Sequence, residues 1–140
     1  MTKKAPRLSI CMPTYNRADL LAETLAHLEK ACGDDVEVVV SDNHSPDHTQ
    51  EVIARFAPRF RHFRSVRQPV NRGPFPNHAA AIQLGTGDYI YTLNDDDELY
   101  MEGLRAAMAV LDSDPQIVPC TGPTRNGAGR KGRFRVPSVR

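Results

Sequence analysis

Four short predicted strands alternate along the chain with segments of helical periodicity, and this alternation constrains the fold more than any other feature. Residues 8–12, 36–40 and 89–93 are rich in apolar or β-branched side chains, and a further strand is expected within 62–67. The other segments predict helices over about 17–31, 45–56, 77–84 and 101–111, because their apolar residues recur every three or four positions. This βαβαβαβα order is typical of an α/β fold with a mostly parallel sheet, right-handed crossovers and helices on both faces.

Local start and stop signals refine these bounds. Pro13 lacks a backbone donor, so we expect it to end the first strand at Met12. Asn16 is a candidate cap for the first helix, and Ser45 is a candidate cap for the second. The valine-rich segment 36–40 fits a parallel strand that is covered on both faces.

A polar cluster follows each predicted strand. The clusters are PTYNR at 13–17, SDNHS at 41–45, NRGPF at 71–75 and NDDDE at 94–98. Ligands of parallel α/β sheets bind beyond the carboxyl ends of the strands, so these clusters are expected to converge on one crevice. No predicted strand is followed by a GxGxxG sequence and the chain has no GxxxxGK sequence, so neither a dinucleotide fingerprint nor a P-loop is indicated.

The last cluster contains four consecutive acidic residues, Asp95, Asp96, Asp97 and Glu98. Their charges repel one another unless a positive group lies among them. Mg²⁺ or Mn²⁺ would satisfy them, because these ions take carboxylate oxygens and complete their coordination with water and substrate phosphates. The alternative is a solvated acidic loop at the start of the next helix, where acidic residues are favoured.

Four other residues are candidates for ligand contacts. Asp42 could accept a hydrogen bond from a uracil imide or a ribose hydroxyl, or it could form an Asx turn into the next helix. Asn71 and Gly73 form a turn, which becomes functional only if a ligand lies against the bare backbone of Gly73. Among the histidines, His78 is the one most worth testing.

Three segments together resemble the N-terminal, nucleotide-sugar-binding part of family 2 glycosyltransferases. They are LSICMPTYNRADLLAETLAHL, VEVVVSDNHSPDHTQEVI and NRGPFPNHAAAIQLGTGDYIYTLNDDDEL, and the match covers about residues 7–112. The resemblance implies a Rossmann-like GT-A three-layer sandwich, C-terminally truncated, and a nucleotide-diphosphate sugar as ligand, with a UDP-sugar the expected donor.

The resemblance also implies roles for individual residues. The nucleotide-binding residues would be Pro13, Thr14, Tyr15, Asn16, Arg17, Asp42, Asn71, Gly73 and His78. The acidic cluster matches the DxD-type metal motif of the family. Asp95 and Asp97 would hold Mg²⁺ or Mn²⁺ on the diphosphate, with Asp96 between them.

The chain departs from the family pattern in three places. Asn77, His78 and Ala79 replace an Ala-Arg-Asn triplet, and Asn94 stands where many members have Asp. No carboxylate follows Asp114, although inverting members need an Asp or Glu general base in a later acceptor-binding part. A non-catalytic nucleotide-sugar-binding module is therefore an alternative to a glycosyltransferase, and a nucleotidyltransferase with a similar sheet and metal carboxylates is a third.

Charge divides the chain into two parts. Residues 1–114 carry 12 Lys and Arg against 17 Asp and Glu, a net charge of −5, and form the predicted nucleotide-sugar-binding domain. Residues 115–140 are expected to be a poorly ordered basic tail, which could contact anionic lipid, while no nucleic-acid partner is expected. No membrane span or leader is apparent, and three cysteines without CxxC spacing suggest a reducing, cytoplasmic setting.

Overall fold

The computed structural model describes residues 4–114 and 116–117. These residues fall into two compact units that divide between Leu99 and Tyr100. The first unit contains the sheet and the helices that cover it, and the second contains helix α4 (Met101–Ser113). The predicted basic tail, residues 115–140, lies outside the described residues except for 116 and 117.

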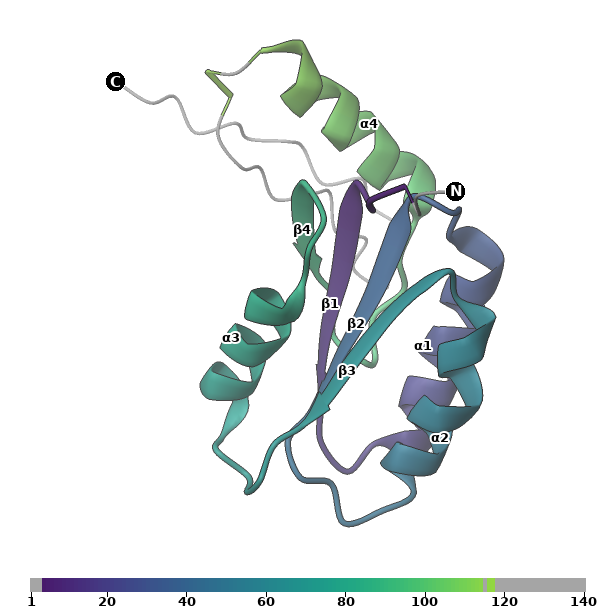
Figure 1. The fold of residues 1–140 in the computed structure, drawn as a ribbon, viewed down its shortest axis with the longest axis vertical. Coiled ribbons are helices and arrows are strands. Elements are labelled where there is room, and N and C mark those ends of the chain that lie inside the picture. Colours follow the sequence, from purple (N-terminus) through teal and green to yellow (C-terminus); the bar gives the residue numbers. More distant parts are fainter. Residues whose placement is uncertain (1–3, 115, 118–140) are drawn as a thin grey trace, which may run out of the picture. The chain divides into compact units, whose positions relative to one another are not determined.

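The first unit is built on a four-stranded parallel sheet (Figure 1). Its strands are β1 (Leu8–Thr14), β2 (Val36–Asp42), β3 (His62–Arg67) and β4 (Tyr89–Thr92). The spatial order is β3-β2-β1-β4, so the first two strands of the sequence occupy the centre. The register aligns Leu8 with Val36 and Thr14 with Asp42, which brings the loops after β1 and β2 together. The predicted parallel α/β sheet is confirmed.

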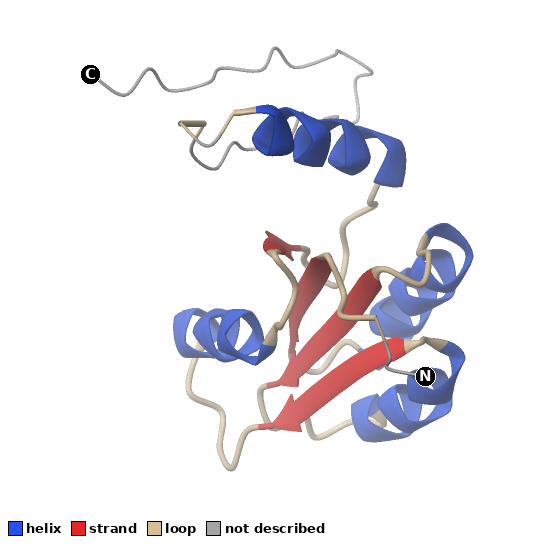
Figure 2. Ribbon diagram, turned by 45° about the horizontal axis from the view of Figure 1, so that its top comes forward, coloured by secondary structure: helices blue, strands red, loops and turns tan. Residues whose placement is uncertain are grey.

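Helices cover both faces of this sheet. They are α1 (Ala18–Ala31), α2 (Thr49–Phe56), the short 3₁₀ turn η1 (Ala57–Arg59) and α3 (Pro74–Leu84). Helices α1 and α2 lie on one face and α3 lies on the other (Figure 2). The unit is therefore a three-layer α/β/α sandwich, as predicted.

The core lies between these layers. Val38, Val39 and Val40 of β2 have no exposed surface, as expected for a central parallel strand. Leu21, Leu25 and Leu28 of α1 are equally buried, and full burial of one such side chain contributes roughly 1.5–3 kcal/mol.

The first strand continues through Pro13 to Thr14, so the prediction that it ends at Met12 was wrong. In a parallel ladder, alternate residues bond to the same neighbouring strand. The Cys11 carbonyl accepts a hydrogen bond from Leu93 N, on the β4 side of the strand. The backbone of Pro13, two residues further on, faces the same side, but at a position beyond the last residue of β4. The missing N–H of Pro13 therefore removes no ladder bond.

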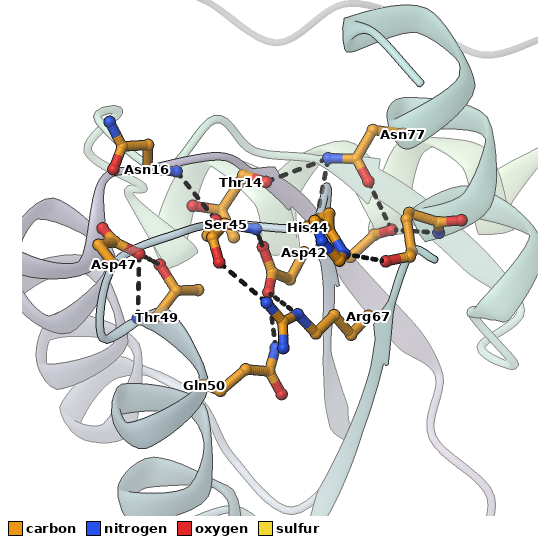
Figure 3. A network of polar contacts seen from close by, with 12 residues as sticks. Thr14, Asn16, Asp42, His44, Ser45, Asp47, Thr49, Gln50, Arg67 and Asn77 are labelled. Carbon is orange, nitrogen blue, oxygen red and sulfur yellow. Dashed lines mark hydrogen bonds and ion pairs between the residues drawn. The ribbon is translucent and has the colours of Figure 1, made fainter. Parts of the chain in front are cut away.

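The predicted helix caps were also wrong, because one side chain, that of Asp47, bonds to the first residue of both helices. Asp47 Oδ2 accepts from Ala18 N at 3.0 Å. Its Oδ1 accepts from Thr49 N at 3.1 Å and from Thr49 Oγ1 at 2.6 Å (Figure 3). Asn16 instead adopts a left-handed φ of 53° just before the helix, and α2 begins at Thr49. A long-range contact therefore replaces the predicted cap of α1, and a local side chain two residues before α2 replaces the predicted cap of that helix.

Cys11 and Cys32 are free cysteines in the part of the chain that the structure describes. Burial, together with the charge of Glu37, raises the pKa of Cys11 to about 12, so its thiol stays protonated near neutral pH. No helix among the described residues is long and apolar enough to cross a membrane.

Replacement of Asp47 by Ala should lower the free energy of unfolding at pH 7 by about 1 kcal/mol, the usual cost of losing a helix cap. Burial acts to raise the pKa of Asp47, but hydrogen bonds from Thr49 and Ala18 outweigh it, and the pKa is lowered. Its contribution is therefore present above the unfolded pKa of about 3.9 and is lost as the pH falls through the folded value.

Urea unfolding at pH 7 and pH 3 measures this difference. Asp88→Ala is the matched control, because Asp88 is exposed and lies 3.9 Å from Arg7 in a weak surface pair. An Asp47→Ala difference of the same size at both pH values would contradict the capping role of the carboxylate.

Candidate functional site

A cavity of about 500 Å³ lies at the carboxyl ends of the strands, within the first unit. Its lining residues come from the segments that follow all four strands, so the structure brings the four polar clusters together. They are Pro13, Thr14, Tyr15, Arg17, Asn43, Asn71, Gly73, Pro74, Asn77, His78, Asn94, Asp95 and Asp96.

Most of the predicted site residues line this cavity. Three do not: Asn16, Asp42 and Asp97. Four lining residues were not among the predicted ligand contacts: Asn43, Pro74, Asn77 and Asn94. Asn43 directly follows Asp42, the last residue of β2. The sequence does not show which of these two side chains faces the cavity, and in the structure it is Asn43.

Asp95 is held in place from two elements, one through its carboxylate and one through its main-chain carbonyl. Its Oδ2 accepts from Thr14 Oγ1 at 2.8 Å, and the Asp95 carbonyl oxygen accepts from Thr24 Oγ1, also at 2.8 Å. Thr14 ends β1 and Thr24 belongs to α1, and the Asp95 side chain is only 5% exposed. The loop after β4 is thus attached to the first βα unit through a buried, oriented carboxylate.

Arg17 supplies the positive charge at this point. Its Nη1 lies 3.2 Å from Asp95 Oδ1 and 3.0 Å from Asp96 Oδ2, so one nitrogen bridges the two carboxylates. The charge of Asp95, its hydrogen bond and the charge of Asp96 raise the pKa of the Arg17 guanidinium. The predicted repulsion within the acidic cluster is relieved here by a side chain of the protein.

Asp97 has a different environment. Its Oδ2 accepts from Asn94 Nδ2 at 2.8 Å, and its N–H donates to the Asn94 carbonyl at 3.2 Å, which closes a turn. With Glu23, His27 and Glu98 it lines a second cavity, of about 330 Å³. Asp95 and Asp96 line both cavities, whereas Asp97 lines the second but not the first.

Asp42 is fully buried and both of its carboxylate oxygens have partners (Figure 3). Oδ1 accepts from Ser45 N at 2.9 Å, and Oδ2 accepts from Gln50 Nε2 at 2.7 Å and lies 3.6 Å from Arg67 Nε. Of the two interpretations of Asp42, this geometry shows the turn into the following helix. Asp42 has no exposed surface and does not line the cavity, so a nucleoside contact through it would require this loop to open.

The neighbouring Asn43 fastens the loop that forms another wall of the cavity. Its Nδ2 donates to Asn71 Oδ1 at 2.9 Å and to Gly73 O at 3.1 Å, and its Oδ1 accepts from Arg72 N at 2.9 Å. Gly73 has a φ of 85°, a conformation that glycine adopts without the strain of a side chain. The predicted turn at Asn71 and Gly73 is present, and it lines the cavity.

Asn77, one of the departures from the family pattern, has a structural role. It is buried, and its Oδ1 accepts from Ser41 Oγ at 2.7 Å. Its Nδ2 donates to the carbonyls of Ser41 at 3.0 Å and Thr14 at 3.3 Å. This amide ties α3 to the ends of β1 and β2, next to His78, which lines the cavity.

The carboxylates beside the cavity are a candidate donor set for a divalent ion. Within residues 4–114 and 116–117, no group of three or more His, Cys, Asp or Glu side chains could hold a metal. Two carboxylates, those of Asp95 and Asp96, meet at one cationic nitrogen. This set fits Mg²⁺ or Mn²⁺ bound through one or two carboxylates with phosphate and water completing the shell.

Comparison with known proteins identifies the family. The sequence model described as "Glycosyl transferase family 2" matches residues 9–138. The chain belongs to this family. It is 35% identical to an abequosyltransferase of Salmonella typhimurium over 81% of the chain. It is 31% identical to a GalNAc(5)-diNAcBac-PP-undecaprenol beta-1,3-glucosyltransferase of Campylobacter jejuni over 74% of the chain.

Solved structures of glycosyltransferases share the fold. S. aureus TarS in complex with UDP-GlcNAc matches 76% of this chain with a TM-score of 0.69 and 26% identity. The mannosyltransferase PcManGT of Pyrobaculum calidifontis, in complex with GDP-Man and Mn²⁺, matches 81% with a TM-score of 0.69 and 29% identity. The fold is therefore that of a GT-A family 2 glycosyltransferase. The chain spans about a third of the length of these relatives.

Replacement of Asp42 by Ala should lower the free energy of unfolding by about 1–3 kcal/mol, because it leaves buried hydrogen-bond donors unsatisfied. Asp42→Asn keeps an acceptor for Ser45 N but loses the charge that faces Arg67, so its cost should be smaller. Urea unfolding measures both costs, and calorimetric titration of the folded fraction with UDP measures binding. Unchanged stability with lost binding would contradict the structural assignment of Asp42.

Proposed function

We propose that this family 2 glycosyltransferase domain binds a nucleotide-diphosphate sugar, with a UDP-sugar as the donor, through Mg²⁺ or Mn²⁺ at the acidic cluster, for sugar transfer to an acceptor. The observation that carries the proposal is the convergence of the Asp95 and Asp96 carboxylates on one cationic nitrogen beside the cavity. Further support comes from the related structures that contain UDP-GlcNAc, or GDP-Man with Mn²⁺.

In this proposal Asp95 and Asp96 hold the metal. The ion supplies charge neutralisation for the departing diphosphate. Thr14 and Thr24 orient Asp95 before any ligand arrives, so little reorganisation is needed on binding. Asp97, predicted from the family motif as a ligand, would need to turn away from Asn94 to take part.

The nucleoside is assigned to the part of the cavity between the end of β1 and the loop at Asn71 and Gly73. Tyr15 is exposed and provides an aromatic ring for the base, and Asn43 holds the loop in position. His78, near the start of α3, is proposed to contact the phosphates from the same cavity. A volume of about 500 Å³ is within the range of small-molecule sites.

A donor-binding role without transfer is the second candidate function. Among the residues that line the cavity, the carboxylates are those of Asp95 and Asp96, and both are assigned to the metal. No other carboxylate that lines this cavity is then left to act as the general base for an acceptor hydroxyl, although Glu23, Asp97 and Glu98 line the second cavity. The acceptor is not assigned.

UDP should bind appreciably only in the presence of Mn²⁺ or Mg²⁺, because uncompensated carboxylates repel the phosphates. Isothermal calorimetry with each ion and with a chelator measures this dependence. Asp95→Asn and Asp96→Asn should each weaken metal-dependent binding by about tenfold or more, which corresponds to about 1.4 kcal/mol.

Asp88→Asn is the control for these variants, since Asp88 is exposed and does not line the cavity. Asp97→Asn tests the third aspartate in the same experiment. Equal affinity with and without chelator would refute the metal assignment. Loss of binding only in Asp97→Asn would assign the metal to the second cavity, which Asp97 lines.

Under the second candidate function, the 140-residue chain should hydrolyse a bound donor slowly but should not transfer the sugar to an acceptor at an enzyme-like rate. Positioning of the acceptor and removal of its proton are each worth orders of magnitude in rate. The assay incubates a panel of nucleotide sugars with lipid, sugar and protein acceptors, and residual hydrolysis should vanish in Asp96→Asn. Rapid transfer of the sugar would exclude a role in donor binding without transfer. Release of pyrophosphate from a nucleoside triphosphate would indicate a nucleotidyltransferase.

A further inference from the structure

We propose that Arg17 occupies the cation position of the acidic loop when no metal is bound, and that a divalent ion displaces its guanidinium toward the phosphates of the donor. This inference rests on the proposed metal and nucleotide binding. It assigns Arg17 two successive partners, the carboxylates first and the diphosphate afterwards.

The first observation is the geometry of the bridge. A single nitrogen, Arg17 Nη1, contacts the carboxylates of two consecutive residues, Asp95 at 3.2 Å and Asp96 at 3.0 Å. A divalent ion shared by the same two carboxylates would need the space that this nitrogen fills. The guanidinium and the ion repel each other at such distances, so the two cannot occupy the position together.

The second observation is the unequal burial of the three partners. The Asp95 side chain is 5% exposed and is fixed by Thr14, whereas the Arg17 and Asp96 side chains are 49% and 48% exposed. The guanidinium can therefore leave without unpacking the core, while Asp95 stays in place as the fixed ligand.

The third observation is that the backbone around Arg17 is held on both sides. Asn16 N donates to Ser45 Oγ at 2.9 Å, and Ala18 N donates to Asp47 Oδ2 at 3.0 Å. The Arg17 carbonyl accepts from Leu21 N at 2.9 Å as the first bond of α1. Only the side chain is then free to move, and it lines the cavity assigned to the nucleotide.

Displacement gives Arg17 a new partner of matching chemistry. A guanidinium binds phosphate oxygens with paired hydrogen bonds, and the diphosphate would lie beside the metal in this cavity. Arg17 therefore opposes binding of the metal alone but favours binding of the metal with the nucleotide. A purely structural ion pair would not produce effects of opposite sign.

The test uses the full 140-residue chain and measures two affinities. Loss of the free Mn²⁺ signal in electron paramagnetic resonance reports Mn²⁺ binding, and calorimetry at saturating Mn²⁺ reports UDP binding. Arg17→Gln should bind Mn²⁺ about two- to fivefold more tightly, the effect expected for removal of a partly exposed ion pair. The same variant should bind UDP with Mn²⁺ more weakly by at least a similar factor.

Arg61→Gln is the matched control. Arg61 is 43% exposed and pairs with Asp34 at 2.8 Å, and neither residue lines the cavity, so both affinities should stay at the wild-type values. Arg17→Lys keeps the charge without the planar fork. It should shift both affinities in the same directions as Arg17→Gln but less, and it serves as the second variant if Arg17→Gln folds poorly by circular dichroism.

The outcomes separate this inference from the proposed function. Unchanged Mn²⁺ affinity in Arg17→Gln and Arg17→Lys, with clear binding to the wild type, overturns the inference and leaves the metal site intact. Tighter binding of both Mn²⁺ and UDP overturns the transfer of Arg17 to the phosphates. Absence of Mn²⁺ binding to the wild type and to both Arg17 variants overturns the inference and the metal assignment together.

Discussion

The parallel pairing of β1 with β2 is the constraint on which the rest of the molecule depends. It places Thr14 opposite Asp42, so two loops that lie far apart in the sequence leave the sheet side by side. Asn43 N then donates to the Thr14 carbonyl, which extends the pairing one step beyond the strands. The cavity is the space that these loops and the loops after β3 and β4 enclose.

The loop after β2 is the main support of the site, although little of its own surface faces the ligand position. Asp42 anchors its start, Asp47 caps two helices, and Asn43 holds the turn at Asn71. Buried hydrogen bonds of this kind are costly to break one at a time, because each leaves an unsatisfied partner. The polar residues of this loop therefore position the cavity wall before any substrate arrives.

Ion pairs hold together the wall of the cavity that Arg17, Asp95 and Asp96 form. Asp95 and Asp96 converge on Arg17, and the threonines at 14 and 24 fix the more buried of the two aspartates. An arginine and a hydrated divalent ion satisfy the same carboxylates in different ways, and only the ion leaves positions open for phosphate oxygens. The family assignment rests on the sequence match and on the shared fold, whereas the ligand roles of these residues remain proposals.

The sequence by itself determined the α/β architecture, the parallel sheet and the convergence of four polar segments at one sheet edge. These features follow from the periodicity of apolar residues and from the alternation of strands with helices, and both patterns can be recognised within short stretches of sequence. Only the tertiary structure decided that Asp47 caps α1 across 29 positions of sequence and that Arg17 meets Asp95 across 78. It also decided that Asp42 is buried while Asn43 lines the cavity. The physical reason is that the direction of a loop side chain is set by strand register and by partners from distant segments, and neither is encoded within the few residues around it.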